Sequence, residues 1–145
     1  MVEKVVFHMY RILLAASPES QEICQRILKN HYLLCVATVP EAQQYLEAGN
    51  IDLIICTLVF DDSRMIDLLR LVKEHRKWKH IPFICLRLVS RILDHPNTLE
   101  GIQNACEALG AAAFLDIGCY SVAPEKQMLE DIEKHLPSRK KPSRN

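Results

Sequence analysis

Five short, nearly uninterrupted runs of apolar residues recur along the chain, at residues 12–15, 33–37, 53–57, 83–86 and 113–116. Polar residues do not alternate with apolar ones inside these runs. Continuous apolar runs of this kind are typical of strands in a parallel sheet, where helices cover both faces. The runs therefore predict five strands, each buried on both sides.

The segments between and after these runs carry apolar residues at helical spacing, as in Met65, Leu68, Leu69 and Val72. Expected helix boundaries carry typical residues, with a serine cap and prolines at starts and glycines at ends: Ser17, Pro18, Pro40, Pro124, Gly49 and Gly110. Strict alternation of strands and helices predicts an α/β fold. It indicates a doubly wound parallel sheet in a single domain.

Composition and charge narrow the classes of partner. Hydrophobic residues make up 49% of the 145 residues and charged residues 25%, which is ordinary globular usage. Eighteen Lys and Arg balance eighteen Asp and Glu, so no overall field draws the protein to nucleic acid or to a membrane. The six cysteines lie far apart without metal-ligand spacing, and no apolar run could span a bilayer. We expect a cytoplasmic protein with reduced thiols, no bound metal and no membrane or nucleic-acid partner.

The two ends of the chain differ from its body. Residues 1–10 form an N-terminal extension in this interpretation, and residues 11–136 form the domain. Residues 137–145 carry four positive and no negative side chains, which predicts a disordered basic tail.

Four segments carry a resemblance to a known family: RILLAASPES, IDLIICTLVFDD, IPFICL and EALGAAAFLDIG. They resemble the response-regulator receiver domain, which accepts a phosphoryl group on an aspartate, and the resemblance covers residues 11 to about 136. It implies a flavodoxin-like, five-stranded parallel sheet of order 2-1-3-4-5 with helices on both faces.

The positions that bind magnesium and phosphate in that family hold other residues here. Ala15 and Ala16, or Ala16 and Ser17, match the acidic pair after the first strand, and Thr57 matches the phosphoacceptor aspartate. Phosphoryl transfer depends on positioning and on charge neutralisation by a cation. We therefore predict a degenerate pseudo-receiver that is not an enzyme and has no cofactor. Thr57 is expected to be buried and hydrogen-bonded.

Two further family positions are also replaced, since Arg87 matches the switch Ser/Thr and Ile117 matches the lysine after the fifth strand. Ile117 predicts an apolar, closed pocket at the former site. The acidic residues Asp61 and Asp62 follow Thr57 in a loop and are expected to face water.

Other features suggest ligand or partner contacts. Arg87 and Arg91 have a spacing that some cyclic-dinucleotide-binding proteins use to grip phosphates. The alternative is that the two arginines form salt bridges or are solvated in the loop. Residues 88–97 form an insertion relative to the family, and residues 75–80 form a basic cluster around Trp78 that we interpret as a solvated helix end. Cys119 is the cysteine to test for reactivity.

These observations predict a phosphorylation-independent signalling module that binds protein partners. The resemblance implies a docking or homodimer face formed by the fourth helix, the fifth strand and the fifth helix, with Ile102, Cys106, Tyr120 and Lys126 as candidate contacts. The alternative is a sensor for a small anionic ligand, such as a cyclic dinucleotide, held by Arg87 and Arg91.

Overall fold

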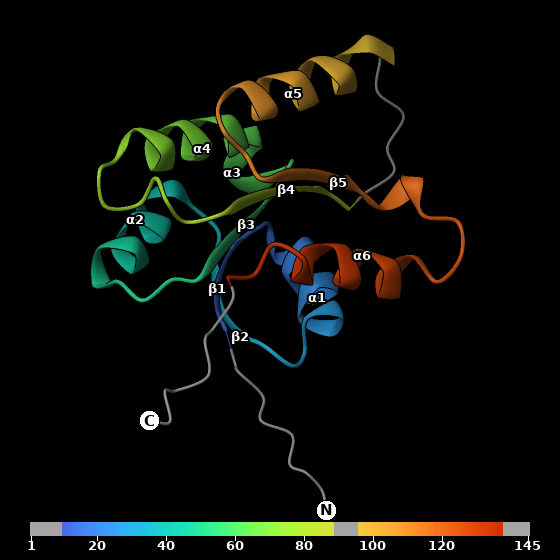
Figure 1. Cartoon of the computed structure of the whole chain (residues 1–145), viewed down its shortest axis with the longest axis horizontal. Coiled ribbons are helices and arrows are strands. Elements are labelled where there is room, and N and C mark those ends of the chain that lie inside the picture. The colour runs from blue at the N-terminus through green and yellow to red at the C-terminus, as the bar shows by residue number, and fades with distance from the viewer. Residues whose placement is uncertain (1–9, 89–95, 138–145) are drawn as a thin grey trace, which may run out of the picture.

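The computed structural model describes residues 10–88 and 96–137, which form a layered α/β domain around one sheet (Figure 1). Five parallel strands are hydrogen-bonded in the order β2-β1-β3-β4-β5. Their bounds are β1 Arg11–Ala15, β2 Tyr32–Val36, β3 Leu53–Thr57, β4 Phe83–Arg87 and β5 Ala113–Asp116. The strand order and the parallel direction expected from the sequence are confirmed.

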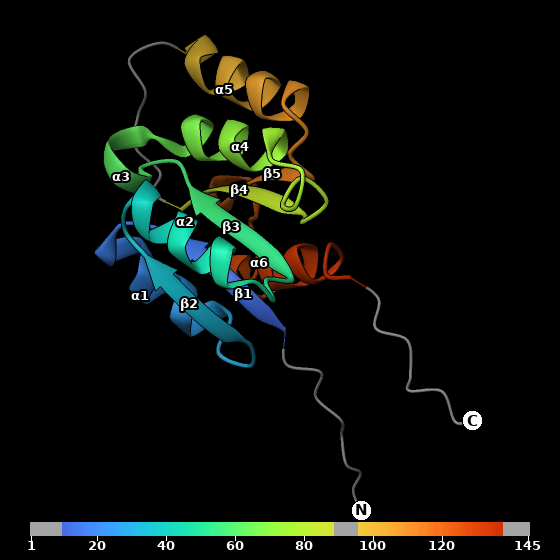
Figure 2. The same ribbon diagram turned by 90° about the vertical axis from the view of Figure 1, so that its left-hand side faces the viewer.

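Helices cover both faces of this sheet. Their bounds are α1 Pro18–Ile27, α2 Val39–Ala48, α3 Phe60–Ser63, α4 Met65–Glu74, α5 Pro96–Ala108, the 3-10 turn η1 Ile117–Cys119 and α6 Pro124–Glu133. Helices α1 and α6 lie on one face, and α2, α4 and α5 lie on the other (Figures 1 and 2). Within the described residues, no helix is long and apolar enough to cross a bilayer.

The apolar runs are continuous because each strand feeds two cores. Along β3, Ile54 and Cys56 point to the α2–α4–α5 side, whereas Leu53 and Ile55 point to the α1–α6 side. All of these side chains are completely buried. The period-two alternation of a strand therefore needs apolar residues at every position when both faces are covered.

The predicted helix boundaries are found in the structure. Ser17 caps α1, and its Oγ accepts a hydrogen bond from the Ser20 N–H, while Pro18 starts the helix. Gly49 and Gly110 follow α2 and α5 with φ of +90° and +102°, a region that a side chain disfavours. Local sequence is enough to mark these ends, because caps act within a single turn.

The two residues that border the predicted domain, Tyr10 and Pro137, contact each other. The Tyr10 hydroxyl donates to the Pro137 carbonyl oxygen at 2.8 Å, which joins the start of β1 to the segment after α6. The remainder of the predicted extension and tail, together with residues 89–95 of the insertion, lies outside the described residues.

Candidate functional site

The candidate site lies at the carboxyl ends of the strands, the edge where ligands gather in open α/β sheets. Strand register brings the expected positions to this edge. Ala15 pairs with Cys56, which places the next residue, Ala16, level with Thr57. Arg87 pairs with Asp116 on the neighbouring strands. Residues from four strands thus meet where the family resemblance places a phosphorylation site.

The turn after β1 offers no carboxylate. Ala15 and Ala16 are completely buried. Ser17 is engaged as the cap of α1, and the Ala16 carbonyl oxygen accepts a hydrogen bond from the Gln21 side-chain amide at 2.9 Å. The groups of this turn are therefore committed to starting a helix.

Thr57 ends β3 with its side chain sealed inside the fold. The residue is 1% exposed, and its Oγ1 has no hydrogen-bond partner among the described residues. Burial agrees with the sequence-based expectation, but the expected hydrogen bond is absent. A buried hydroxyl without a partner costs about 1–3 kcal/mol, because it has lost its water and gained nothing in return.

The acidic loop after Thr57 has a structural role at the start of α2. Asp61, Asp62 and Ser63 all have positive φ, between 46° and 66°, so the loop makes one left-handed turn. This turn carries the Asp61 carboxylate to the start of α2, where its Oδ2 accepts the Val39 N–H at 2.9 Å. Asp62 is exposed. The two carboxylates therefore do not converge, and Asp61 stabilises a helix N-terminus instead of facing water.

Arg87 forms an ion pair, as the alternative to ligand binding expected, with a partner that the sequence did not identify. Its Nη1 donates to Oδ2 of Asp116 at 3.0 Å, and each of the two side chains is only 12% exposed. The other oxygen of Asp116 accepts the Gly118 N–H at 3.0 Å. A signal was present, because opposite charges end two neighbouring strands. The pairing, however, depends on their register.

Ile117 is the residue for which the sequence predicts an apolar, closed pocket. It starts the 3-10 turn η1, is only partly buried and packs on the α1–α6 side. Its neighbour Asp116 carries a charge to the same edge. The edge is therefore closed by an ion pair next to an apolar side chain.

The four residues predicted for a docking face do not form one surface. Cys106 is completely buried against the sheet, so its assignment as a contact residue is wrong. Ile102 packs partly into the same core, on the α2–α4–α5 side. Tyr120 is partly buried on the α1–α6 side, where its hydroxyl donates to Asp131 at 2.6 Å. Lys126 is exposed on α6.

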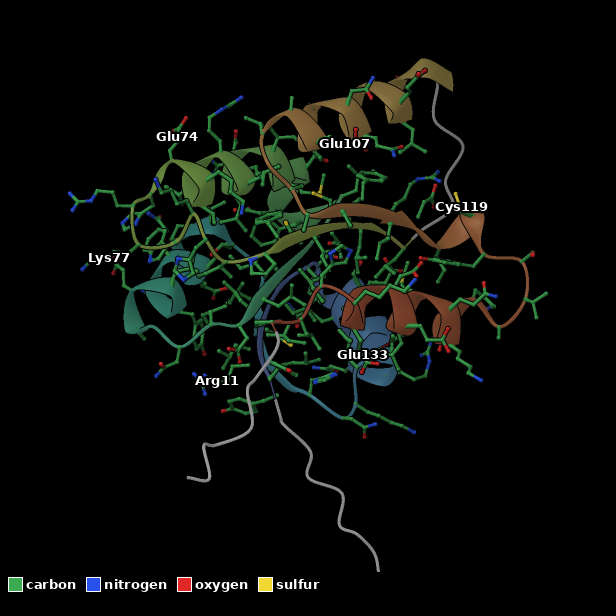
Figure 3. The ribbon with its side chains drawn as sticks, viewed as in Figure 1. Arg11, Glu74, Lys77, Glu107, Cys119 and Glu133 are labelled. Atoms are coloured by element: carbon green, nitrogen blue, oxygen red, sulfur yellow. The ribbon has the colours of Figure 1, made fainter. Side chains whose placement is uncertain are left out.

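A hollow lies near these residues, over the outer side of β5. It has a volume of about 310 Å³ and receives side chains from α5, β5, the segment after it and α6. Its lining includes Leu99, Gln103, Phe114, Cys119, Tyr120 and Asp131. Cys119 is exposed there, beyond the end of β5, as Figure 3 shows. Of the four candidate contact residues, Tyr120 lines this hollow.

The basic cluster lies at the opposite end of the sheet, where Lys77 is labelled in Figure 3. Trp78 is only 6% exposed and belongs to the core, and His75 stacks on it with ring centroids 3.6 Å apart. Lys73 ties the turn together by donating to the carbonyl oxygens of Lys79 and Ile81. A hollow of about 610 Å³ lies beside it. The aromatic ring of this cluster is therefore a packing residue rather than an exposed stacking platform.

Comparison with known proteins gives a match only at the level of structure. No protein-family model matches the chain, and no curated protein matches its sequence. The phosphorylated cyanobacterial phytochrome response regulator RcpA superposes with a TM-score of 0.69 at 20% identity, covering 90% of this chain and 99% of that one. The Mn²⁺-bound response regulator Rcp1 gives 0.66 at 21% identity, over 89% and 99%. The chemotaxis response regulator CheY4 of Vibrio cholerae gives 0.66 at 17% identity, over 88% and 99%.

The chain has the fold of response-regulator receiver domains. The receiver fold raises the question of a divalent cation, and the residues at this edge do not fit one. Hard cations take several oxygen ligands, carboxylates above all. Ala16 offers only a methyl group, the Ser17 hydroxyl caps α1, and the Thr57 side chain is buried. Within the described residues, no cluster of three or more His, Cys, Asp or Glu is arranged to hold a metal ion.

Proposed function

We propose that this chain is a signalling module that acts by binding protein partners and is not controlled by phosphorylation of its own receiver site. The receiver fold supports a signalling role, as the related structures are response regulators. The observation that carries the proposal is Thr57, which stands in place of an acidic acceptor and is 1% exposed. An alcohol in that position forms no acyl phosphate, and its burial keeps phosphodonors away.

The surrounding charges also argue against phosphotransfer. A receiver site must neutralise an incoming phosphoryl group, which demands cations facing the acceptor. The described cation at this edge is Arg87, and its guanidinium is paired with Asp116. An anion entering here would have to break that pair and would meet an uncompensated carboxylate.

Treatment with acetyl phosphate and Mg²⁺ is expected to leave the intact mass of the protein unchanged. The physical reason is the lack of a carboxylate acceptor at Thr57 and of acidic ligands at Ala16 and Ser17. A receiver domain that retains its aspartate serves as the positive control in the same reaction. A mass increase equal to one phosphoryl group would contradict the proposal.

The docking surface in this proposal is the hollow over β5, between α5 and α6. It combines apolar side chains, including Leu99 and Phe114, with the polar groups of Gln103 and Asp131. Mixed apolar and polar lining is typical of protein interfaces. A second copy of the chain is one candidate occupant, and another regulatory protein is the other.

Reversing a charge on α6, the helix that contributes Asp131 to this hollow, is expected to weaken docking without affecting the fold. Lys126→Glu should change the free energy of unfolding by no more than about 0.5 kcal/mol, because Lys126 is exposed. It should still reduce dimerisation, or capture of a partner from a cell extract, because charge reversal at an interface slows the encounter. Sedimentation velocity and quantitative affinity capture measure the two effects.

The matched control is Lys77→Glu, an exposed lysine at the opposite end of the sheet. It should leave both dimerisation and capture unchanged. If Lys77→Glu abolishes binding while Lys126→Glu does nothing, the interaction surface is the basic cluster of residues 75–80 and the assignment to the hollow fails.

The ligand-sensor alternative receives no support from the residues that the structure describes. It requires Arg87 and Arg91 to act together on an anion. Arg87 is held by Asp116 at 3.0 Å, and Arg91 lies outside the described residues. Protein binding is therefore the function that the described geometry favours.

A further inference from the structure

The hollow beside the basic cluster lies at the amino ends of β3 and β4, the edge of the sheet opposite the receiver site. One of its sides is formed by the end of α2 and the segment that follows, and the other by the turn between α4 and β4 (Figure 1). Its volume of about 610 Å³ is about twice that of the hollow over β5. Sites for small molecules have volumes of about 300–1,000 Å³, so this hollow has the size of a ligand site.

The floor of this hollow is apolar. Four of the residues that line it are core residues between 3% and 9% exposed, namely Leu46, Ile51, Trp78 and Ile81. All four belong to the core on the α2–α4–α5 side of the sheet. Burial of apolar surface is the source of favourable free energy at such a floor, so it suits a flat ring and offers little to a bare inorganic ion.

The rim of the hollow is polar, and its two sides differ in charge. The turn contributes His75, His80 and the exposed Lys77, which forms no ion pair within the part of the chain that the structure describes. The opposite side contributes Glu47 and Asn50. An ammonium and imidazoles favour an anionic group, whereas a carboxylate favours a hydrogen-bond donor. The two sides together therefore favour a ligand with an anionic group at one end and a donor at the other.

The hydrogen bonds of His75 leave a further donor in this rim. Its Nδ1 accepts the Lys77 N–H at 3.1 Å, so this hydrogen-bond pattern assigns the proton of the neutral imidazole to Nε2. The ring is held in place because it stacks on Trp78, with ring centroids 3.6 Å apart and an angle of 9° between the planes. His75 therefore adds an N–H donor of defined orientation to the basic side of the rim.

Both sides of the hollow are held by hydrogen bonds within the protein. The Lys73 ammonium donates to the carbonyl oxygens of Lys79 and Ile81 at 3.0 and 2.9 Å, which closes the turn. On the opposite side, the Asn50 carbonyl oxygen accepts the Arg11 Nε–H at 2.9 Å. A site that is already formed orders few groups on binding, and this lowers the entropic cost of taking up a ligand.

We propose that this hollow binds a small aromatic anion that carries a hydrogen-bond donor on its ring. The ring lies on the apolar floor, the anionic group lies near Lys77 and His80, and the ring donor faces Glu47. A nucleoside monophosphate with an amino-bearing base has this chemistry, and so does an aromatic carboxylate with a ring amino group. The inference does not rest on the proposed docking function, because the two hollows lie at opposite ends of the sheet.

The test titrates the full-length, isotope-labelled chain with adenosine monophosphate and, separately, with para-aminobenzoate, and follows nitrogen–proton correlation spectra. The chain has a single tryptophan, so one indole N–H resonance reports on the floor of the hollow. This resonance and the backbone resonances of Gly49 and Asn50 should shift and saturate with at least one of the two ligands. The ligand that binds more tightly identifies the anionic group as a phosphate or a carboxylate.

Two probes separate the contributions of the ring and the anionic group. Adenosine lacks the anionic group, and inorganic phosphate lacks the ring. Each should bind about tenfold or more weakly than the better aromatic anion, which is the effect of losing one charged hydrogen bond or a buried ring. Inorganic phosphate that binds as tightly as the aromatic anions would overturn the proposal, because the floor would then contribute nothing.

A pair of lysine variants tests the position of the anionic group. Lys77→Glu should raise the Kd of the better ligand about tenfold or more, because a charge-assisted contact is replaced by repulsion. Lys29→Glu makes the same change of charge at an exposed lysine outside the hollow and should leave the Kd within about twofold, because solvent screens a distant charge. Equal weakening by both variants would overturn the proposal. So would a Trp78 resonance that neither aromatic anion shifts at millimolar concentration.

Discussion

Replacing Arg87 with methionine is expected to lower the free energy of unfolding by about 3–5 kcal/mol, the cost of leaving a buried charge without its partner. The substitution strands the Asp116 carboxylate, which is 12% exposed and accepts the Arg87 guanidinium at 3.0 Å. Urea unfolding followed by circular dichroism measures the loss. The double variant Arg87→Met with Asp116→Leu should recover most of it, because burying neither charge avoids the desolvation cost.

A surface pair in the same chain provides the control. Arg64 and Asp67 are joined at 3.1 Å, but their side chains are 51% and 52% exposed. Arg64→Met should therefore cost less than about 1 kcal/mol, since solvent screens an exposed pair. If Arg87→Met were as mild as Arg64→Met, the Arg87–Asp116 pair would not be a desolvated interaction, and its role in closing the strand edge would be wrong.

Thr57 is expected to respond in opposite directions to two substitutions. Thr57→Val should raise the free energy of unfolding by about 1 kcal/mol or more, because it removes a buried hydroxyl that has no hydrogen-bond partner. Thr57→Asp should lower it by several kcal/mol at neutral pH, because a carboxylate would be buried without a cation. Equilibrium unfolding in urea measures both changes in the free energy of unfolding.

The pH dependence identifies the mechanism for the aspartate variant. Burial raises the pKa of an introduced carboxyl above its unfolded value of about 3.9. The penalty is therefore largest at pH values above the raised pKa, shrinks as the pH falls below it and vanishes at pH values well below about 3.9, where the group is protonated in both states. An aspartate variant that is equally unstable at pH 4.5 and pH 7 would point to a steric clash instead.

Thr38→Val is the matched control for Thr57→Val. The Thr38 hydroxyl oxygen accepts the Glu41 N–H at the start of α2, so the same substitution there removes a helix cap. It should destabilise the protein by about 1 kcal/mol. Opposite signs for one chemical change at two threonines would show that the hydrogen-bond environment decides the outcome.

The polar groups at the carboxyl ends of the strands link the expected stability changes to the proposed function. A receiver site needs acidic ligands and an accessible acceptor. In this chain, polar groups at the same edge of the sheet form structural contacts instead. Ser17 caps α1, Asp61 accepts the Val39 N–H at the start of α2, and Arg87 pairs with Asp116. Because these polar groups already have partners and the Thr57 hydroxyl is buried, the edge has little capacity left for a phosphoryl group. This is why the proposed docking surface is an outer one, the hollow over β5.

The sequence by itself determined the secondary structure and the fold class. Uninterrupted apolar runs predict the five strands to within one residue at each end, because a doubly covered strand leaves no position for polar side chains. Ser17, Gly49 and Gly110 mark helix boundaries through interactions within one turn. The missing carboxylates at Ala16 and Thr57 were also visible from residue type alone.

Only the tertiary structure decided which distant residues meet. The pairing of Arg87 with Asp116 depends on the β4–β5 register, and the contact of Asp61 with α2 depends on a left-handed turn that periodicity does not reveal. The sealed hydroxyl of Thr57 and the place of Cys106 in the same core as β3 and β4 depend on how helices pack against the sheet. Local patterns report the environment of a single residue. The partner of a side chain is set by register and packing, which arise from the whole chain.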